Sequence, residues 1–283
     1  MSRTRFLDIK RFLHFADNNA IVGTTDRMYK LRPLMDLLNK RFQQHGVFHR
    51  NLSIDESMVK YFGHHPCKQF IQGKPIRFGY NNSMHCSSDG YCYAFDTYCG
   101  KSSISENLPL GSRAVLSFCE KISTPSDHIL YFDNFFNRID LLATLRMKSF
   151  RATGTIRENR FKNAPLPAKK EMEKRDRGYF ASCFDTQNEV LLVKWRDSSV
   201  VTMATNYDSV DPIGAVSRWS SSKKEKVKVA QPSVFGTYNN GMGGMDLLDQ
   251  TANNYRMGIR SKKWWVLFTQ MLNISVEDSP NVV

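Results

Sequence analysis

Four aspartates stand where a carboxylate could do chemistry. Asp55 is flanked by apolar residues in a predicted strand, and Asp133 ends the buried apolar run HILYF. Asp246 begins a predicted helix behind two glycines, and Asp249 lies three residues further along the same helical face. Carboxylates in such apolar settings are costly unless they are paired or bind a metal. We therefore take Asp55, Asp133 and Asp246 as candidate catalytic metal ligands, with Asp249 as a further metal ligand.

The residue types indicate which ion such a site would hold. Convergent carboxylates without His or Cys partners favour Mg²⁺ or Mn²⁺ over zinc. Two such ions activate a water or a 3′-hydroxyl and stabilise the leaving oxygen during displacement at phosphorus. Each aspartate alone also has an ordinary explanation as a turn or salt-bridge residue, and Asp246 alone suits a helix N-cap. The metal hypothesis therefore depends on the occurrence of all these aspartates together and not on any one of them.

The elements that must position these acids follow from the hydrophobic pattern. Helical spacing over 4–15 and 31–42 predicts an α-helical start. Three strand-like segments then follow over 51–63, 78–90 and 91–101, with a hairpin turn at Asp89-Gly90. A helix over 110–122, a strand at HILYF, a helix over 139–147 and a strand at RATGT complete the order βββαβαβ. This α/β order with a mixed sheet is the ribonuclease-H-like arrangement, which places the first and fourth strands side by side.

Composition and charge narrow the functional class. The chain has 283 residues, 40 Lys+Arg against 27 Asp+Glu, and a formal net charge of +13, which favours a polyanionic partner such as nucleic acid. No apolar run is long enough for a membrane span or resembles a signal peptide. The six cysteines include no CxxC pair, so we expect no zinc site.

Several longer motifs resemble one known family, the piggyBac-type transposases and the cellular proteins derived from them. The matching strings are SIDESM, KPIRFGY, DGYCYAFDTYCGK, YFDNFF, GTIRENR and NNGMGGMDLLDQ. They occur in family order from the first residues to about Trp265. Strings of this length are far more specific than a short glycine fingerprint.

The resemblance implies a DDD catalytic core that cuts transposon ends with two divalent ions, joins them to a TTAA target and closes the ends transiently as hairpins. The three catalytic aspartates fall on Asp55, Asp133 and Asp246, and the additional one falls on Asp249. The implied domains are a first helical dimerisation and DNA-binding half (1–50), the core (51–159 and 233–255), a β-rich insertion (160–232) and the second helical half (256–283). We expect nuclear localisation and double-stranded DNA as the partner. The expected DNA contacts are Lys74, Arg77, Asn134, Arg157, Arg160, Arg260, Lys262 and Lys263.

The sequence also departs from the family pattern. Asn81, Asn82 and Ser83 place polar side chains in a predicted core strand, and Ser87 stands where the family often has Asp. The sequence ends soon after Trp265, so we expect the later helices to stop within one or two turns. The expected consequences are a weakened homodimer, no transposition by this chain alone, and lost packing partners for Phe6, Phe12, Leu13, Leu34 and Leu38. Two alternatives stay open: a domesticated DNA-binding protein without catalysis, and an interaction module independent of nucleic acid.

Overall fold

A nine-stranded mixed sheet forms the centre of the molecule. The computed structural model describes residues 1–21, 25–100, 108–161, 164–254 and 265–277. The sheet order is β2-β3-β1-β5-β6-β9-β8-β7, and β4 pairs with the remaining part of β3. Its strands are β1 (Asn51–Lys60), β2 (Gln69–Phe70), β3 (Phe78–Ser87), β4 (Cys92–Thr97), β5 (Ile129–Phe132), β6 (Arg151–Thr155), β7 (Phe180–Asp185), β8 (Val190–Arg196) and β9 (Val200–Thr205).

The first part of this sheet is ribonuclease-H-like, as the sequence predicted. Strands β1, β3 and β4 are antiparallel neighbours, and the short β2 adds one pairing that the pattern did not reveal. Strand β5 then pairs parallel to β1, and β6 pairs parallel to β5. Parallel neighbours require crossovers, and the two crossovers contain α3 (Leu110–Cys119) and α4 (Ile139–Met147). The order βββαβαβ is confirmed.

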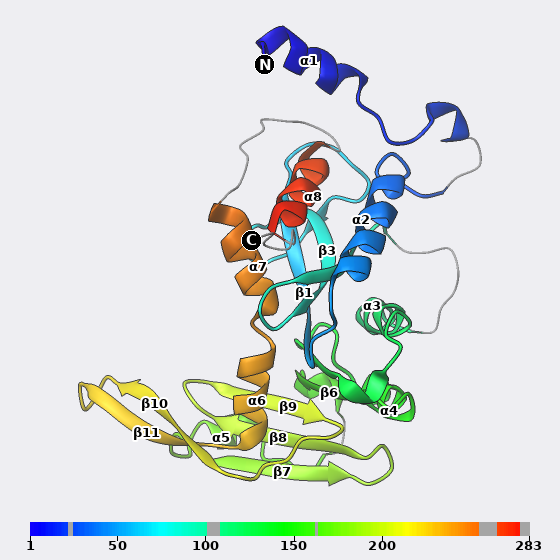
Figure 1. Ribbon diagram of the computed structural model, residues 1–283. Coiled ribbons are helices and arrows are strands. Elements are labelled where there is room, and N and C mark those ends of the chain that lie inside the picture. The colour runs from blue at the N-terminus through cyan, green and yellow to red at the C-terminus, as the bar shows by residue number, and fades with distance from the viewer. Residues whose placement is uncertain (22–24, 101–107, 162–163, 255–264, 278–283) are drawn as a thin grey trace.

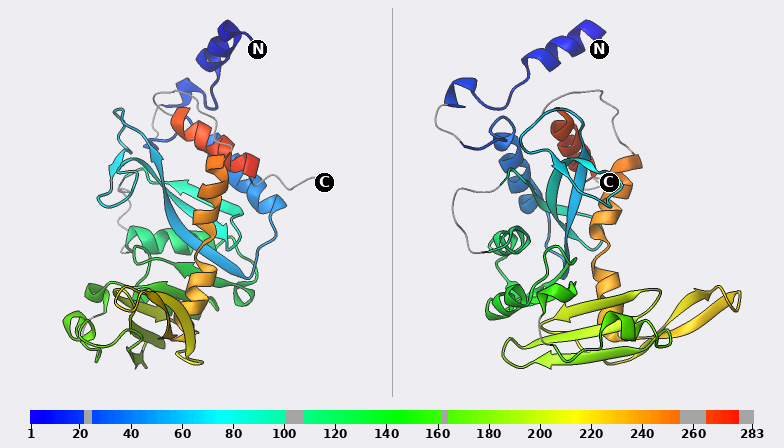
Figure 2. Two further views of the ribbon diagram at one scale, coloured as in Figure 1. Left: turned by 90° about the vertical axis from the view of Figure 1, so that its left-hand side faces the viewer. Right: turned by 180° about the vertical axis from the view of Figure 1, so that it is seen from behind.

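Helices cover the two faces of the sheet (Figures 1 and 2). The sheet separates two of the three apolar clusters of the described residues, and the third lies around β8, β9 and α6 (Ser233–Gly241). Helices α3 and α4 pack on one face, where Leu52 and Ile54 of β1 are fully buried. The opposite face carries α2 (Arg32–His45), α7 (Gly244–Asn254) and α8 (Trp265–Glu277). The other helices are α1 (Arg3–Phe12) and α5 (Lys169–Met172). Among the described helices, none is long and apolar enough to cross a membrane.

The segment after β6 continues the sheet at its far edge. Strand β9 pairs antiparallel with β6, and β8 and β7 extend the sheet outward. Strands β10 (Gly214–Ser220) and β11 (Glu225–Gln231) form a separate two-stranded ribbon, which projects from the molecule at the lower left of Figure 1. This end of the molecule lies opposite α1.

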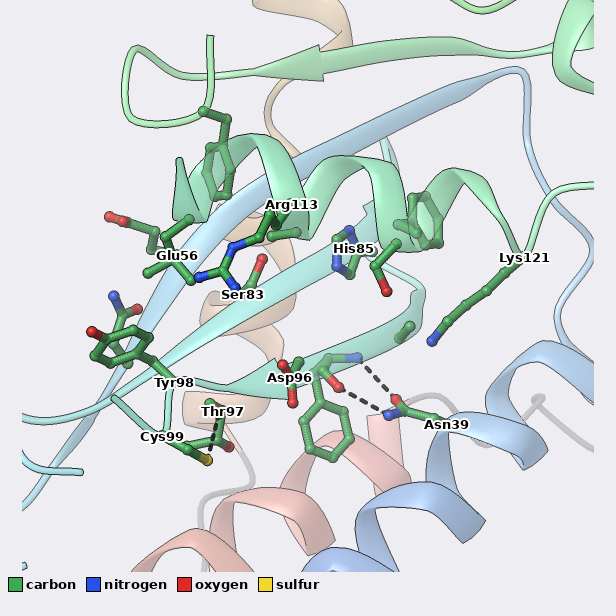
Figure 3. A pocket seen from close by; sticks show the side chains of 18 of the residues that line it. Asn39, Glu56, Ser83, His85, Asp96, Thr97, Tyr98, Cys99, Arg113 and Lys121 are labelled. Atoms are coloured by element: carbon green, nitrogen blue, oxygen red, sulfur yellow. Dashed lines mark hydrogen bonds between the residues drawn. The ribbon is translucent and has the colours of Figure 1, made fainter. Parts of the chain in front are cut away.

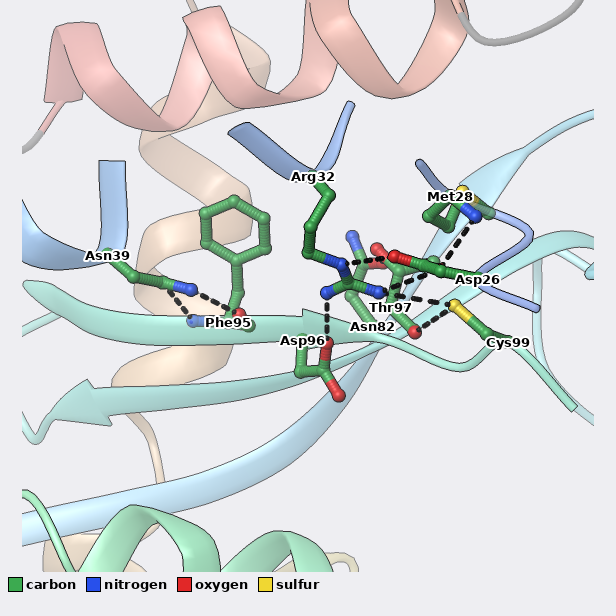
Figure 4. Close-up of polar contacts among 9 residues, drawn as sticks. All are labelled: Asp26, Met28, Arg32, Asn39, Asn82, Phe95, Asp96, Thr97 and Cys99. Carbon is green, nitrogen blue, oxygen red and sulfur yellow. Dashed lines mark hydrogen bonds and ion pairs between the residues drawn. The ribbon is translucent and has the colours of Figure 1, made fainter. Parts of the chain in front are cut away.

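Helix α2 docks on the free edge of β4 through side chains that satisfy exposed backbone groups. Asn39 Nδ2 donates to the Phe95 carbonyl at 2.9 Å, and the Phe95 amide donates to Asn39 Oδ1 at 2.9 Å. Arg32 donates to Asp26 at 2.7 Å and forms an ion pair with Asp96 at 3.3 Å (Figure 4). The Asn39 bonds occupy the Phe95 backbone groups and so protect this part of the β4 edge from pairing with another strand.

The packing of α2 and α8 corrects the prediction about the terminal helices. Helix α8 is 13 residues long, and its Leu267, Met271 and Ile274 are buried in the same core as α2. Leu34 and Leu38 therefore have packing partners, because they contact this core. Helix α1 differs: none of its residues is buried, and it stands away from the body (Figure 1).

The Asn39 contact gives a stability prediction. Asn39→Ala removes both bonds to Phe95 and leaves an amide and a carbonyl at the edge of β4, so we expect a loss of about 2 kcal/mol in the free energy of unfolding. Lys40→Ala, on the exposed side of the same helix, is the matched control and should change stability by less than about 0.5 kcal/mol. Urea unfolding of both variants measures the difference. Equal stabilities would show that the Asn39 bonds contribute nothing.

Candidate active site

Asp55 and Asp133 come together because their strands are parallel neighbours in register. Ile54 of β1 pairs with Phe132 of β5, and each aspartate is the next residue in the sequence after one of these two. Strand β1 continues to Lys60, whereas β5 ends at Phe132, so Asp133 begins the loop at the carboxyl end of β5. The adjacency of the first and fourth strands, expected from the sequence, is confirmed.

Asp246 reaches this region on α7, which packs against β1 and β3. The helix begins at Gly244, so Asp246 lies in the first turn and is not the N-cap residue. At Gly244 the helix meets the sheet so closely that a Cβ atom would lie 1.8 Å from the Ser87 carbonyl oxygen and 2.6 Å from Ser53 Oγ. Asp246 is exposed and Asp249 is half-buried.

The charges in this region act on one another. Burial, together with the charges of Asp133 and Asp246, raises the pKa of Asp55 to about 6. The Glu56 amide donates to Asp55 Oδ1 at 2.7 Å and Lys74 lies within electrostatic reach, and both contacts act in the opposite direction. Without a cation, this arrangement places like charges together at neutral pH, so a bound cation would stabilise it.

The donor chemistry fits a hard cation, since carboxylate oxygens are what Mg²⁺ and Mn²⁺ prefer. Among the described residues, however, no group of three His, Cys, Asp or Glu side chains is arranged closely enough to hold an ion. The structure thus brings Asp133 and Asp246 into electrostatic reach of Asp55, and the described residues do not form a closed coordination shell.

Arg160 and Arg157 order the loop that follows Asp133. Arg160 Nη1 donates to the carbonyl oxygens of Asn134, Phe135 and Asn137 at 2.5, 3.1 and 2.7 Å. Arg157 Nε donates to Asn134 Oδ1 at 2.7 Å. The Asp133 carboxylate accepts a bond of 2.8 Å from the Phe135 amide, which holds the side chain against the loop. Three predicted DNA contacts, Asn134, Arg157 and Arg160, are therefore bonded to one another beside Asp133.

The other predicted DNA contacts are placed differently. Lys74 forms an ion pair with Glu56 at 3.6 Å, and Arg77 is exposed at the start of β3. Arg260, Lys262 and Lys263 lie outside the described residues.

Two residues near the aspartates were not foreseen from the sequence. The side chain of Glu56 is buried, and this burial raises its pKa. The negative charges of Asp133 and Asp55 act on the pKa of Glu56 in the same direction. Tyr238 of α6 is also within electrostatic reach of Asp133 and Asp55, and burial raises the pKa of its hydroxyl. The signal for Glu56 was its place in SIDESM beside Asp55. Tyr238 lies eight residues before Asp246, and only the helix packing brings it here.

Asn81 and Ser83, two of the polar residues of the predicted core strand, line a cavity of about 440 Å³ between α3 and the strands β3 and β4 (Figure 3). The carbonyl oxygen of the Asn81 side chain, Ser83 Oγ and His85 Nδ1 are buried there without a hydrogen-bond partner. Asn82 points to the other face, where it accepts a bond of 2.8 Å from Thr97 Oγ1. Polar residues of β3 therefore line a cavity on the face of the sheet that α3 covers.

Fold and site together define a ribonuclease-H-like domain with one acidic residue within its first strand, one directly after the neighbouring parallel strand and one on its last core helix. The chain belongs to the family described as Transposase IS4, whose model matches residues 1–277. The predicted membership among piggyBac-derived proteins is confirmed by its relatives. It is 39% identical over 269 residues to human PiggyBac transposable element-derived protein 3 and 36% identical over 270 residues to human PiggyBac transposable element-derived protein 2.

The relatives are longer than this chain. Each of the two alignments covers 94% of this chain and 45% of the relative, so the chain spans about half the length of the curated relatives it matches. A similar solved structure is the piggyBac transposase synaptic complex with hairpin DNA, with a TM-score of 0.81 and 24% identity. That match covers 99% of this chain and 56% of the solved chain, and it establishes the fold.

Proposed function

We propose that this transposase-derived chain binds DNA and catalyses metal-dependent strand cleavage and transfer at TTAA targets. The observation that carries the proposal is the β1–β5 register, which sets Asp55 within β1 beside Asp133 at the carboxyl end of β5, with Asp246 in electrostatic reach of Asp55. Neighbouring carboxylates whose charge is only partly compensated suit a reaction in which cations and phosphates enter together.

The residues that would hold two Mg²⁺ or Mn²⁺ ions are Asp55, Asp133, Asp246 and Asp249. When bound, such ions supply an activated oxygen nucleophile and stabilise the leaving oxygen at phosphorus. Arg160 and Arg157 keep the loop after β5 in position, and this loop carries Asp133. Lys74 compensates part of the negative charge of Asp55 and Glu56.

The wider parts of the proposal rest on charge and family. The net charge of +13 supports double-stranded DNA as the partner, and the similar solved structure is a synaptic complex with hairpin DNA. We assign DNA recognition also to Lys74, Arg77 and the basic residues near 260, and we assign the protein to the nucleus. The homodimer, the domain boundaries and the inability of this chain alone to transpose stay predictions.

A second function is a domesticated DNA-binding protein without catalysis. It is favoured by the open arrangement of the carboxylates, since no three metal-type ligands among the described residues close around one ion. Metal-dependent nicking of duplex DNA separates the two functions, because only the first requires the aspartates.

Both functions predict strongly salt-dependent DNA binding. Each basic side chain that meets a phosphate releases condensed counterions, so the dissociation constant for duplex DNA should rise at least 100-fold between about 50 and 200 mM salt. Fluorescence anisotropy with a labelled duplex measures this change. Salt-insensitive binding, or no binding at the lower salt concentration, would support the interaction module that does not use nucleic acid.

A further inference from the structure

Three exposed phenylalanines form one aromatic patch at the outer edge of the core sheet. Phe62, Phe70 and Phe78 are 70%, 57% and 41% exposed. The rings of Phe70 and Phe78 lie 4.8 Å apart between centroids, and those of Phe62 and Phe78 lie 6.4 Å apart. Exposed aromatic rings that gather in this way indicate a binding surface, since single exposed apolar residues are ordinary but clusters are not. We call these three residues the phenylalanine patch.

Backbone pairing at the sheet edge holds the three rings of the patch in place. Phe70 and Phe78 are paired across β2 and β3, so the two-residue strand β2 holds them side by side. Phe62 follows the end of β1, where the Tyr61 amide donates to the Phe78 carbonyl at 3.1 Å. The segment between β1 and β3 lies at the outer rim of the molecule, in light blue on the left of Figure 2. The backbone therefore presents the rings outward from a fixed frame.

Basic side chains accompany the patch. Lys60 Nζ lies 5.3 Å from the centroid of the Phe62 ring, and Lys68 Nζ lies 6.0 Å from that of the Phe78 ring. The segment 60–79 contains two further basic residues, Lys74 and Arg77, and has no acidic residue. Aromatic faces flanked by ammonium groups match a chain that alternates flat bases with phosphates, because bases stack on the rings while phosphates meet the cations.

The patch is connected to the candidate active site by one strand. Asp55 and Lys60 are five residues apart on β1, about 17 Å at the usual rise of a strand. Lys74 lies at the Asp55 end of this stretch, since it pairs with Glu56 and its charge acts on Asp55. A DNA strand at the aspartates thus meets Lys74 at one end of this stretch of β1 and Lys60 at the patch end.

We infer that the phenylalanine patch binds unpaired nucleotides of a DNA strand next to the cleavage site. The inference rests on the proposed function, because it places the same substrate on both surfaces. Duplex DNA has its bases stacked inside and offers the rings little to bind, whereas unpaired bases have free faces. The patch therefore gives the chain a preference for single-stranded DNA that the basic surface alone does not provide.

The test compares a labelled single-stranded oligonucleotide with a duplex of the same sequence and length, by anisotropy with the full chain. Phe70→Ala should weaken binding of the single strand at least about fivefold and change duplex binding less than about twofold. Phe70→Leu keeps an apolar side chain but removes the aromatic face, so it should weaken the single strand similarly. Phe184→Leu on β7 is the matched control, because Phe184 is also 57% exposed, and it should have no effect.

The outcomes are distinct. Unchanged single-strand binding in the Phe70 variants overturns the inference, and so does an equal loss for single strand and duplex. Wild-type affinity in Phe70→Leu together with a loss in Phe70→Ala also overturns it, because the contact is then apolar and not base stacking. If the chain neither binds nor nicks duplex DNA but shows the Phe70-dependent preference, the proposed function fails and the patch stands. If duplex binding and nicking persist while the preference is absent, the patch alone fails.

Discussion

Asp133→Asn is expected to reduce Mg²⁺-dependent nicking of duplex DNA at least about 100-fold while leaving DNA affinity unchanged or slightly increased. The substitution keeps the size of the side chain and its oxygen toward the Phe135 amide, a bond of 2.8 Å in the wild type. It removes one negative charge beside Asp55, and metal sites lose far more from a missing charged ligand than from altered neighbours. Relaxation of a supercoiled plasmid carrying TTAA sites, with Mg²⁺, Mn²⁺ or EDTA, measures the effect.

Asp140→Asn is the control for this experiment. Asp140 is exposed in the first turn of α4, seven residues beyond Asp133, and pairs with Arg138 at 3.0 Å. The nicking activity of the Asp140→Asn variant should stay within about twofold of the wild type. Equal nicking by the Asp133 variant would refute the metal-site assignment. No nicking by the wild type, with duplex binding intact, would favour the DNA-binding protein without catalysis.

Gly244→Ala is expected to cause the second large effect, a loss of at least about 3 kcal/mol in the free energy of unfolding. The new methyl group would overlap the Ser87 carbonyl oxygen at 1.8 Å, and Ser53 Oγ would lie 2.6 Å away. The Ser87 carbonyl cannot yield cheaply, because Ser87 is paired with Leu52 in the β1–β3 ladder. Helix α7 must move outward instead, and it carries Asp246 away from Asp55 and Asp133.

The neighbouring glycine provides the comparison. A Cβ atom on Gly243 would meet nothing within 4 Å, so Gly243→Ala should change stability by less than about 1 kcal/mol. Urea unfolding of both variants decides the point. Similar stabilities for the two variants would show that α7 does not depend on close contact at Gly244. We also expect the Gly244 variant to lose nicking, whereas the Gly243 variant keeps it.

The sequence determined the order of elements and much of the core sheet. The β-branched and aromatic residues of the first three strands, the apolar run HILYF and the helical period over 139–147 are local patterns, and each produced the expected element. They also fixed the adjacency of Asp55 and Asp133, because parallel crossover rules leave few arrangements for this order of strands and helices. The motifs identified the family by the same local information.

Tertiary structure alone decided what surrounds the aspartates and what the polar or exposed residues do. Tyr238 and Lys74 approach the site only through the packing of α6 and the β2–β3 hairpin, and no local pattern encodes that approach. Asn39 forms hydrogen bonds with the edge of β4, 56 residues away in the sequence. Helix α8 packs in the same apolar core as α2, which the sequence analysis did not predict. The physical reason is that propensity and periodicity act within a few residues, whereas burial, charge and edge protection depend on which distant segments meet.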